Sequence, residues 1–279
     1  MEMKTVALPS GERVPALGMG TWHMGEDFVP RRQEVATLRR GQDLGLRVID
    51  TAEMYGDGVA EQIVGEAIRG RRDDAFIVSK VLPQHATRIG TVAACEGSLA
   101  RMRTDRIDLY LLHWRGPIHL TETLYAFQDL LDAGKIRYWG VSNFDVDDME
   151  DLFDLAGGTD CATDQILYNL LRRGPELNLL PWLRRHRIPI MAYSPIEQAR
   201  LLIKPELVRF AQRHGMTPAQ VALAWLLRND DVIPIPKTSR IERLEENVAA
   251  MNYHLSAEQL DELDRLFPAP SHVVPLEMI

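Results

Sequence analysis

The sequence, 279 residues long, predicts an α/β fold: a (β/α)8 TIM barrel preceded by a β-hairpin and followed by an extra C-terminal helix. Short apolar runs alternate eight times with longer amphipathic runs, a pattern that favours parallel strands joined by helices. The length also suits one barrel of this kind, which typically needs about 250 residues. We therefore expect a single domain that spans residues 1–279.

The eight strands are expected at residues 17–20, 46–50, 75–79, 107–112, 136–141, 161–166, 188–192 and 232–235. The competing fold is an open doubly wound sheet with a crevice for a dinucleotide. Its fingerprint G-x-G-x-x-G is incomplete, because the segment LGMGTWH has His23 where the third glycine belongs. The barrel is therefore the favoured fold.

Local signals mark the ends of several elements. Thr121 and Thr217 are suitable N-caps for the helical patterns that follow them. Residues 5–17 are expected to form a β-hairpin around the turn sequence PSG. The pattern of residues 256–267 predicts one more amphipathic helix, which a proline-rich tail follows.

Composition argues against several classes of function. The hydrophobic content of 46% and charged content of 26% are ordinary for a globular enzyme. A formal net charge of −8 disfavours binding to nucleic acid or to anionic lipid. No apolar run has the length of a membrane span or a signal peptide, and the two cysteines, Cys95 and Cys161, form no metal or disulfide framework. We expect a cytoplasmic monomer without a metal site.

Ionisable residues lie at the ends of three consecutive predicted strands. LRVID ends at Asp50, AFIVSK at Lys80 and DLYLLH at His113, and Tyr55 follows Asp50 in the loop TAEMYG. The carboxyl ends of all strands in a parallel barrel open onto one face, where the active site lies. We therefore expect these four side chains to converge into one site for proton transfer.

The four residue types suit delivery of a proton to a carbonyl oxygen. A tyrosine phenol has an ordinary pKa of about 10, which is too high for an efficient acid at neutral pH. A Lys80 ammonium would lower the pKa of Tyr55, and Asp50 would hold Lys80 charged by pairing with it. His113 would form a hydrogen bond with the carbonyl oxygen.

Each residue also has a structural interpretation. Asp50 could cap a helix, and Tyr55 could be a surface aromatic. Lys80 could be solvated, and His113 could be a core histidine with its hydrogen bonds satisfied. Their shared position on adjacent strand ends favours the functional interpretation. A Schiff-base aldolase with Lys80 as nucleophile is an open alternative, although the neighbouring Asp50 would keep that amine protonated.

At these residues the chain resembles the aldo-keto reductase family, closest to its short bacterial methylglyoxal and aldehyde reductases. The family pattern of Asp, Tyr five residues later, then Lys and His on successive strands is matched by Asp50, Tyr55, Lys80 and His113. The stretches IDTAEMYG, LLHW, GKIRYWGVSNF and AYSP extend the resemblance over nearly the whole chain. The resemblance implies NADPH-dependent reduction of small aldehydes and ketones to alcohols, with Tyr55 as general acid.

The resemblance also implies where the cofactor and the substrate bind. The nicotinamide contacts would be Ser142, Asn143, Gln165 and Tyr193. The contacts to the 2′-phosphate and adenosine would be Lys237, Thr238, Arg243, Glu246 and Asn247. Other cofactor residues would be Gly20, Thr21, Trp22, Asp50 and Ser194, and the substrate pocket would contain Trp22, Tyr55, His113 and Trp114. A helix N-terminus beside two cations suits a phosphate, while ion pairs within an exposed helix, such as Arg243 with Glu246, are the structural alternative.

Two segments depart from the family pattern. The loop between Ser194 and Lys204 is short, so less chain is available to cover the pyrophosphate. The tail after Phe267 has only twelve residues, whereas members selective for large substrates carry longer tails. We therefore expect an open pocket that takes small substrates. A second alternative comes from members that act as non-enzymatic NADPH-binding redox sensors or regulatory subunits, with negligible turnover.

Overall fold

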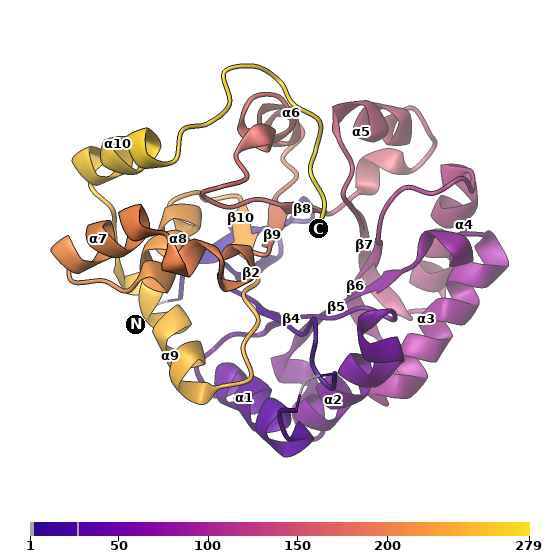
Figure 1. The fold of residues 1–279 in the computed structure, drawn as a ribbon. Coiled ribbons are helices and arrows are strands. Elements are labelled where there is room, and N and C mark those ends of the chain that lie inside the picture. The colour runs from indigo at the N-terminus through magenta and orange to yellow at the C-terminus, as the bar shows by residue number, and fades with distance from the viewer. Residues whose placement is uncertain (1–2, 27) are drawn as a thin grey trace.

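Eight parallel strands form one sheet at the centre of the molecule, and helices surround it (Figure 1). This computed structural model describes residues 3–26 and 28–279. The strands are β3 (Met19–Gly20), β4 (Val48–Asp50), β5 (Phe76–Val81), β6 (Ile107–Leu112), β7 (Ile136–Ser142), β8 (Asp164–Leu167), β9 (Ile190–Tyr193) and β10 (Val232–Pro234). They pair in chain order from β3 to β10, which places the carboxyl ends of all of them on one face.

Hydrogen bonds between the first and last strands close the sheet into a barrel. The N–H of Gly18 donates to the carbonyl oxygen of Pro234 at 3.0 Å, and the N–H of Gly20 donates to that of Pro236 at 3.1 Å. The close approach requires glycine at position 20, because a Cβ there would lie 2.8 Å from the carbonyl oxygen of Ile235. The predicted (β/α)8 barrel is confirmed.

The helices are α1 (Arg31–Asp43), α2 (Val59–Ile68), α3 (Arg88–Met102), α4 (Leu120–Asp132), α5 (Val146–Phe153), α6 (Leu179–Arg185), α7 (Pro205–Arg213), α8 (Pro218–Leu227), α9 (Ile241–Ala249) and α10 (Ala257–Leu266). Thr217 caps α8 in a capping box with Gln220, as predicted. The prediction for Thr121 is wrong, because the side chain of His119 caps α4 by accepting from the Thr121 N–H. Within the described ranges, no helix is long and apolar enough to cross a membrane.

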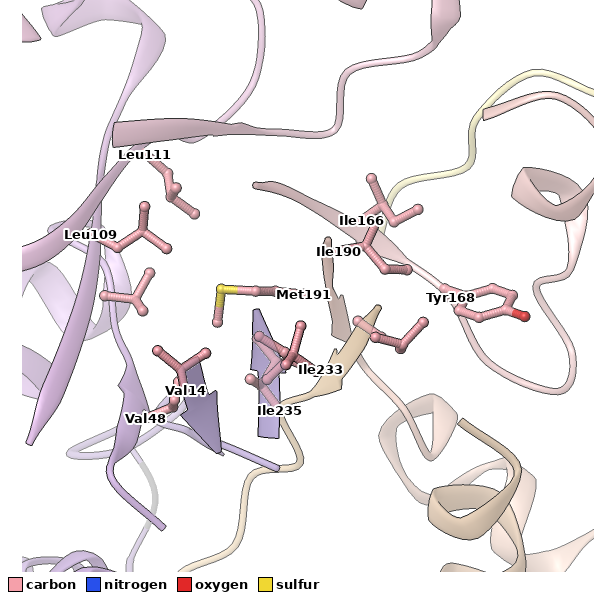
Figure 2. Packing of buried hydrophobic residues seen from close by; sticks show 14 of the residues in the cluster. Val14, Val48, Leu109, Leu111, Ile166, Tyr168, Ile190, Met191, Ile233 and Ile235 are labelled. Atoms are coloured by element: carbon pink, nitrogen blue, oxygen red, sulfur yellow. The ribbon is translucent and has the colours of Figure 1, made fainter. Parts of the chain in front are cut away.

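Apolar side chains fill the inside of the barrel below the strand ends. Figure 2 shows Met191 of β9 surrounded by buried side chains from other strands and from the residue after β10, among them Val48, Leu109, Leu111, Ile233 and Ile235. Burial of each such side chain contributes roughly 1.5–3 kcal/mol. Side chains two apart on a strand share a face, so the inward position after Val48 is Asp50, the last residue of β4.

The N-terminal hairpin closes the barrel at the amino ends of the strands. Its strands β1 (Thr5–Ala7) and β2 (Arg13–Pro15) pair antiparallel, as predicted, and Val14 of β2 lies among the inward side chains in Figure 2. The extra C-terminal helix, predicted at 256–267, is α10.

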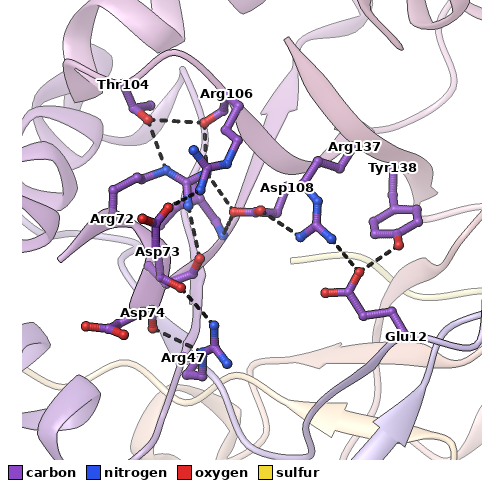
Figure 3. Close-up of polar contacts among 12 residues, drawn as sticks. Glu12, Arg47, Arg72, Asp73, Asp74, Thr104, Arg106, Asp108, Arg137 and Tyr138 are labelled. Atoms are coloured by element: carbon purple, nitrogen blue, oxygen red, sulfur yellow. Dashed lines mark hydrogen bonds and ion pairs between the residues drawn. The ribbon is translucent and has the colours of Figure 1, made fainter. Parts of the chain in front are cut away.

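An ion-pair network ties this hairpin to the lower rim of the barrel (Figure 3). The buried Asp108 of β6 accepts from Arg72 at 2.7 Å and from Arg137 at 3.0 Å. Arg137 also donates to Glu12 of the hairpin at 2.6 Å, and the hydroxyl of Tyr138 donates to Glu12 at 2.7 Å. These contacts lie at the opposite end of the strands from Asp50 and stabilise the barrel there.

Candidate active site

Four ionisable side chains meet at the carboxyl ends of β4, β5 and β6. The ammonium nitrogen of Lys80 lies 2.9 Å from both carboxylate oxygens of Asp50. It also donates to the carbonyl oxygen of Thr51 at 2.8 Å and to the hydroxyl of Tyr55 at 3.1 Å. His113 follows β6 directly, and its ring meets the Tyr55 ring edge-on with centroids 5.9 Å apart. The structure therefore brings together the four residues that the strand ends singled out.

The loop after β4 points Tyr55 at Lys80. Tyr55 begins a 3-10 turn, η1 (Tyr55–Gly58), in which Gly56 and Gly58 have φ values of 56° and 85°. Glycine adopts this left-handed backbone without steric cost, so the chain can fold back toward β5. The Lys80 nitrogen consequently lies 4.8 Å from the centre of the Tyr55 ring.

Lys80 is held as an ammonium ion. Its side chain is completely buried, which by itself lowers its pKa, but the charge of Asp50 and the contact with Tyr55 outweigh burial and raise the pKa above its ordinary value. A solvated lysine is therefore excluded. An amine that is protonated at neutral pH is a poor nucleophile, so the geometry also disfavours the Schiff-base aldolase.

The net pKa of Tyr55 differs from the prediction. Burial raises the pKa of Tyr55 above its ordinary value, and the ammonium of Lys80 offsets this increase only in part. The expected lowering of the tyrosine pKa is thus wrong in its net direction, although the contribution of Lys80 has the expected sign. Tyr55 stays protonated at neutral pH, and Lys80 would stabilise the phenolate left after it gives up its proton.

His113 is neutral in this setting. Burial and the nearby charge of Lys80 lower the pKa of His113 to about 2. Its Nδ1 atom is buried and has no hydrogen-bond partner among residues 3–26 and 28–279, which does not support a satisfied core histidine. A neutral imidazole can orient an oxygen by hydrogen bonding, whereas the more readily available proton here belongs to Tyr55.

The residues predicted to hold a nicotinamide ring form a connected network on β7, β8 and β9. The hydroxyl of Ser142 donates to the carbonyl oxygen of Gln165 at 2.8 Å. The side-chain amide of Asn143 donates to the carbonyl oxygen of His113 at 3.1 Å, and it accepts from the hydroxyl of Tyr193 at 2.8 Å. These strand ends are therefore joined to the end of β6, where His113 lies.

Sequence reasoning missed a contact in the centre of the site. The side-chain nitrogen of Gln165 donates to Asp50 Oδ1 at 2.7 Å. The two residues are 115 positions apart and lie on strands that are not neighbours in the sheet. No local pattern in the sequence indicates such a contact.

The residues after β3 lie beside the four-residue cluster. The hydroxyl of Thr21 donates to the backbone carbonyl oxygen of Asp50 at 2.9 Å. The ring of Trp114 packs on His113 with centroids 4.9 Å apart, so Trp114, His113 and Tyr55 form one row of rings. The ring of the half-buried Trp22 packs at a tilt against that of His23, with centroids 4.1 Å apart, and its place in a substrate pocket stays a prediction.

The residues predicted to bind a phosphate and adenosine gather at the start of α9. Lys237 pairs with Gly20 through a parallel bridge, which places Thr238 and the start of α9 at the carboxyl end of the barrel. The side chain of Arg240, the N-cap residue of α9, makes no capping hydrogen bond. Arg243 and Glu246 lie in the first turns of this helix and the buried Asn247 follows them.

The ion pair between Arg243 and Glu246, which the structural interpretation of this helix predicts, is not found among the described residues. The ion pair of α9 runs from Glu245 to Arg40 of α1 at 2.6 Å, and no pair between Arg243 and Glu246 occurs in the described part of the chain. The exposed Arg243 is therefore not committed to a carboxylate there.

The loop after β9 is as short as predicted. It begins at Ser194, whose φ is 47°, passes through two 3-10 turns and reaches α7 at Pro205. Its buried Glu197 accepts from Asn169 at 2.8 Å and from Arg172 at 2.7 Å. The loop is therefore anchored to the segment after β8.

The C-terminal tail returns to the face that carries the site. Figure 1 shows the tail running from α10 past α6 and ending near the centre of the ring of strands. Arg172, which holds the loop after β9, also donates to Glu277 of the tail at 2.5 Å. Burial raises the pKa of Tyr193, and a hydrogen bond from the backbone of Ile279 lowers it in part. The short tail led us to expect an open pocket. The tail instead covers part of the entrance to the barrel at the carboxyl ends of the strands.

Comparison with known proteins gives consistent matches along the chain. Residues 16–267 match the Aldo/keto reductase family. The chain is 47% identical over 284 residues to methylglyoxal reductase YeaE of Escherichia coli K12, with all of both chains covered. It is 33% identical to a glyoxal reductase of Bacillus subtilis 168, covering 94% of this chain and 92% of that one. A crystal structure of an aldo-keto reductase from Klebsiella pneumoniae in complex with NADPH superimposes over the full length of both chains, with a TM-score of 0.97 and 50% identity.

Proposed function

This chain belongs to the aldo/keto reductase family, and we propose that it is an NADPH-dependent enzyme that reduces small aldehydes and ketones, methylglyoxal among them, to alcohols. One observation carries the proposal: a protonated Tyr55 lies 3.1 Å from a buried ammonium that Asp50 holds in place. Relatives that are named methylglyoxal and glyoxal reductases support the substrate class. That this protein is cytoplasmic and monomeric stays a prediction.

The residues at the site fit NADPH. The amino end of α9, which its N-cap residue Arg240 does not cap by a side-chain hydrogen bond, offers backbone N–H groups. Lys237 and Arg243 add positive charge suited to a 2′-phosphate. The side-chain oxygen of Gln165 accepts no hydrogen bond from the described residues, so it is open to a carboxamide donor. When bound, NADPH supplies the hydride that reduces the carbonyl carbon.

Side chains of this protein supply the proton and stabilise the charge that its transfer leaves. Tyr55 donates its hydroxyl proton to the carbonyl oxygen as negative charge develops there. The ammonium of Lys80, at 3.1 Å, stabilises the resulting phenolate. The neutral His113 orients the carbonyl oxygen by a hydrogen bond, and the tail beside Tyr193 limits the access of water and of large molecules.

The alternative of a non-enzymatic sensor has less support. A sensor needs the cofactor site but has no use for a proton donor held beside a buried ammonium. The cost of burying Lys80 and Asp50 is considerable, and the chain retains both groups next to Tyr55. Turnover of NADPH with a carbonyl substrate distinguishes the two functions directly.

We expect short α-oxoaldehydes to be better substrates than bulky ketones. The tail narrows the mouth of the barrel and leaves little apolar surface to bind the distant parts of a large molecule, so remote binding energy is scarce. Absorbance of NADPH, followed across a panel of aldehydes and ketones, gives kcat/KM for each. A steroid-sized ketone with a higher kcat/KM than every short aldehyde would contradict this expectation.

We expect a strong preference for NADPH over NADH. A hydrogen bond to a charged group contributes about 1.5–3 kcal/mol, so Arg243→Ala should weaken NADPH binding by roughly tenfold to a hundredfold and leave NADH binding nearly unchanged. Fluorescence titration measures both affinities. Arg265→Ala on the distant α10 is the matched control, because it also removes one exposed arginine. Equal kcat/KM for the two cofactors in the wild type would refute the preference.

A further inference from the structure

A hydrogen bond crosses the inside of the barrel at the level of the site. Gln165 on β8 donates from Nε2 to Asp50 Oδ1 on β4 at 2.7 Å. Four strand positions separate β8 from β4 in the sheet of eight, so the two residues face each other across the closed barrel. Their exposed fractions are 1% and 2%. Asp50 is consequently held by Lys80 from the neighbouring strand and by Gln165 from the opposite wall.

Gln165 is itself held firmly. Its backbone carbonyl oxygen accepts from the hydroxyl of Ser142 at 2.8 Å and from the N–H of Asn143 at 3.0 Å. Its Nε2 atom also lies 3.8 Å from the sulfur of Met191, the residue it pairs with on β9. The backbone of Gln165 is therefore held in place, and its side-chain amide extends from there to Asp50.

We propose that Gln165 is a positioning residue for proton transfer: its amide fixes the carboxylate of Asp50, and through it the ammonium of Lys80 under the hydroxyl of Tyr55. The inference rests on the proposed function and adds to the cofactor contact that the family resemblance implies for Gln165. Hydrogen bonds from a donor to a carboxylate are short and strong. Without this donor, Asp50 Oδ1 would lose its partner on the β8 side and the carboxylate could turn.

Several titratable groups surround the contact between Asp50 and Gln165. They are Lys80 from β5, Tyr55 from η1, His113 after β6 and Tyr193 from β9. Asp164 precedes Gln165 on β8, and successive side chains point to opposite faces of a strand. Gln165 itself has no titratable group, so an ionisable replacement should introduce a new pH dependence.

Gln165→Glu provides the sharpest test because it has the same shape. Burial and the negative charge of Asp50 favour the protonated form of the new carboxyl, which can donate its O–H to Asp50 in place of the amide. As pH rises and this carboxyl ionises, two carboxylates face each other and the arrangement fails. We expect the kcat of Gln165→Glu to fall along a new descending limb as the pH rises, a limb that the wild type does not show. Gln165→Leu, which has no donor at any pH, should lower kcat by roughly tenfold to a hundredfold throughout.

The measurement is kcat against pH at saturating NADPH, with the affinity for NADPH titrated separately by fluorescence. Gln128→Glu on α4 is the control, since it makes the same chemical change at an exposed position. A residue that only contacts the cofactor would weaken NADPH binding and leave the pH profile of kcat unchanged. That result, or a Gln165→Leu variant with wild-type kcat, would overturn the proposal. If Gln165→Leu does not fold, the profile of Gln165→Glu decides the question.

An additional readout separates this inference from the proposed function. The titration of Tyr55, taken as the tyrosinate absorbance that a Tyr55→Phe substitution removes, needs no turnover. It should move to higher pH in Gln165→Glu, because an added negative charge near Tyr55 disfavours the phenolate. An unmoved titration contradicts the inference even if the enzyme is active. A wild type that oxidises no NADPH when carbonyl compounds are present contradicts the proposed function alone.

Discussion

Tyr55→Phe should lower kcat for carbonyl reduction by about 10²–10⁴-fold or more, the range that general acid catalysis typically contributes. The substitution removes the hydroxyl that lies 3.1 Å from Lys80 and keeps the aromatic ring against His113. The neutral His113 is not expected to replace the acid, since its pKa is about 2. Steady-state kinetics with NADPH and methylglyoxal measure the loss.

The affinity of Tyr55→Phe for NADPH should stay close to that of the wild type, because the predicted cofactor contacts come mainly from β7, β8, β9 and the start of α9. Fluorescence titration checks this point. Tyr125→Phe on α4 is the matched control, because this tyrosine is 54% exposed and belongs to a helix rather than to a strand end. A Tyr55→Phe enzyme that keeps most of its activity would remove Tyr55 from the mechanism.

Lys80→Met should lower both kcat and the free energy of unfolding. The ammonium of Lys80 is completely buried beside Asp50, and removing one partner of a buried ion pair typically costs about 3–5 kcal/mol. Tyr55, whose pKa burial already raises, would also lose the charge that stabilises its phenolate. Kinetics and urea unfolding of the same preparation measure the two effects.

A second substitution separates stability from activity. Asp50→Asn added to Lys80→Met removes the unpaired carboxylate, so the double variant should recover most of the lost stability and none of the activity. Lys135→Met is the control, because the pair of Lys135 with Glu96 is exposed and such pairs contribute about 0–1 kcal/mol. Equal unfolding midpoints for Lys80→Met and the wild type would show that the buried pair does not stabilise the barrel.

Local patterns in the sequence were enough to predict the barrel and the four residues of the cluster. Strand β6 was predicted at residues 107–112 and is found there, because an apolar run between two turns determines a buried strand. Once eight strands alternate with helices, topology alone brings Asp50, Lys80 and His113 to one face. The proximity of these side chains therefore required no knowledge of packing.

Features that depend on packing could not be predicted in the same way. The net pKa of Tyr55 depends on how deeply its hydroxyl is buried, and the identity of a residue does not indicate how deeply it is buried. The bond from Gln165 to Asp50 depends on the diameter of the closed barrel and on side-chain orientation across it. The path of the tail depends on the pair between Arg172 and Glu277, which lie 105 positions apart.

The position of Ile279 has a consequence for how the protein is produced. Ile279 lies beside Tyr193 at the mouth of the barrel, so an affinity tag fused to it would begin at the entrance to the site. A purification tag there would obstruct substrates or displace the tail from Arg172. The hairpin near the other terminus closes the opposite end of the barrel, and a tag attached ahead of it would leave the entrance clear.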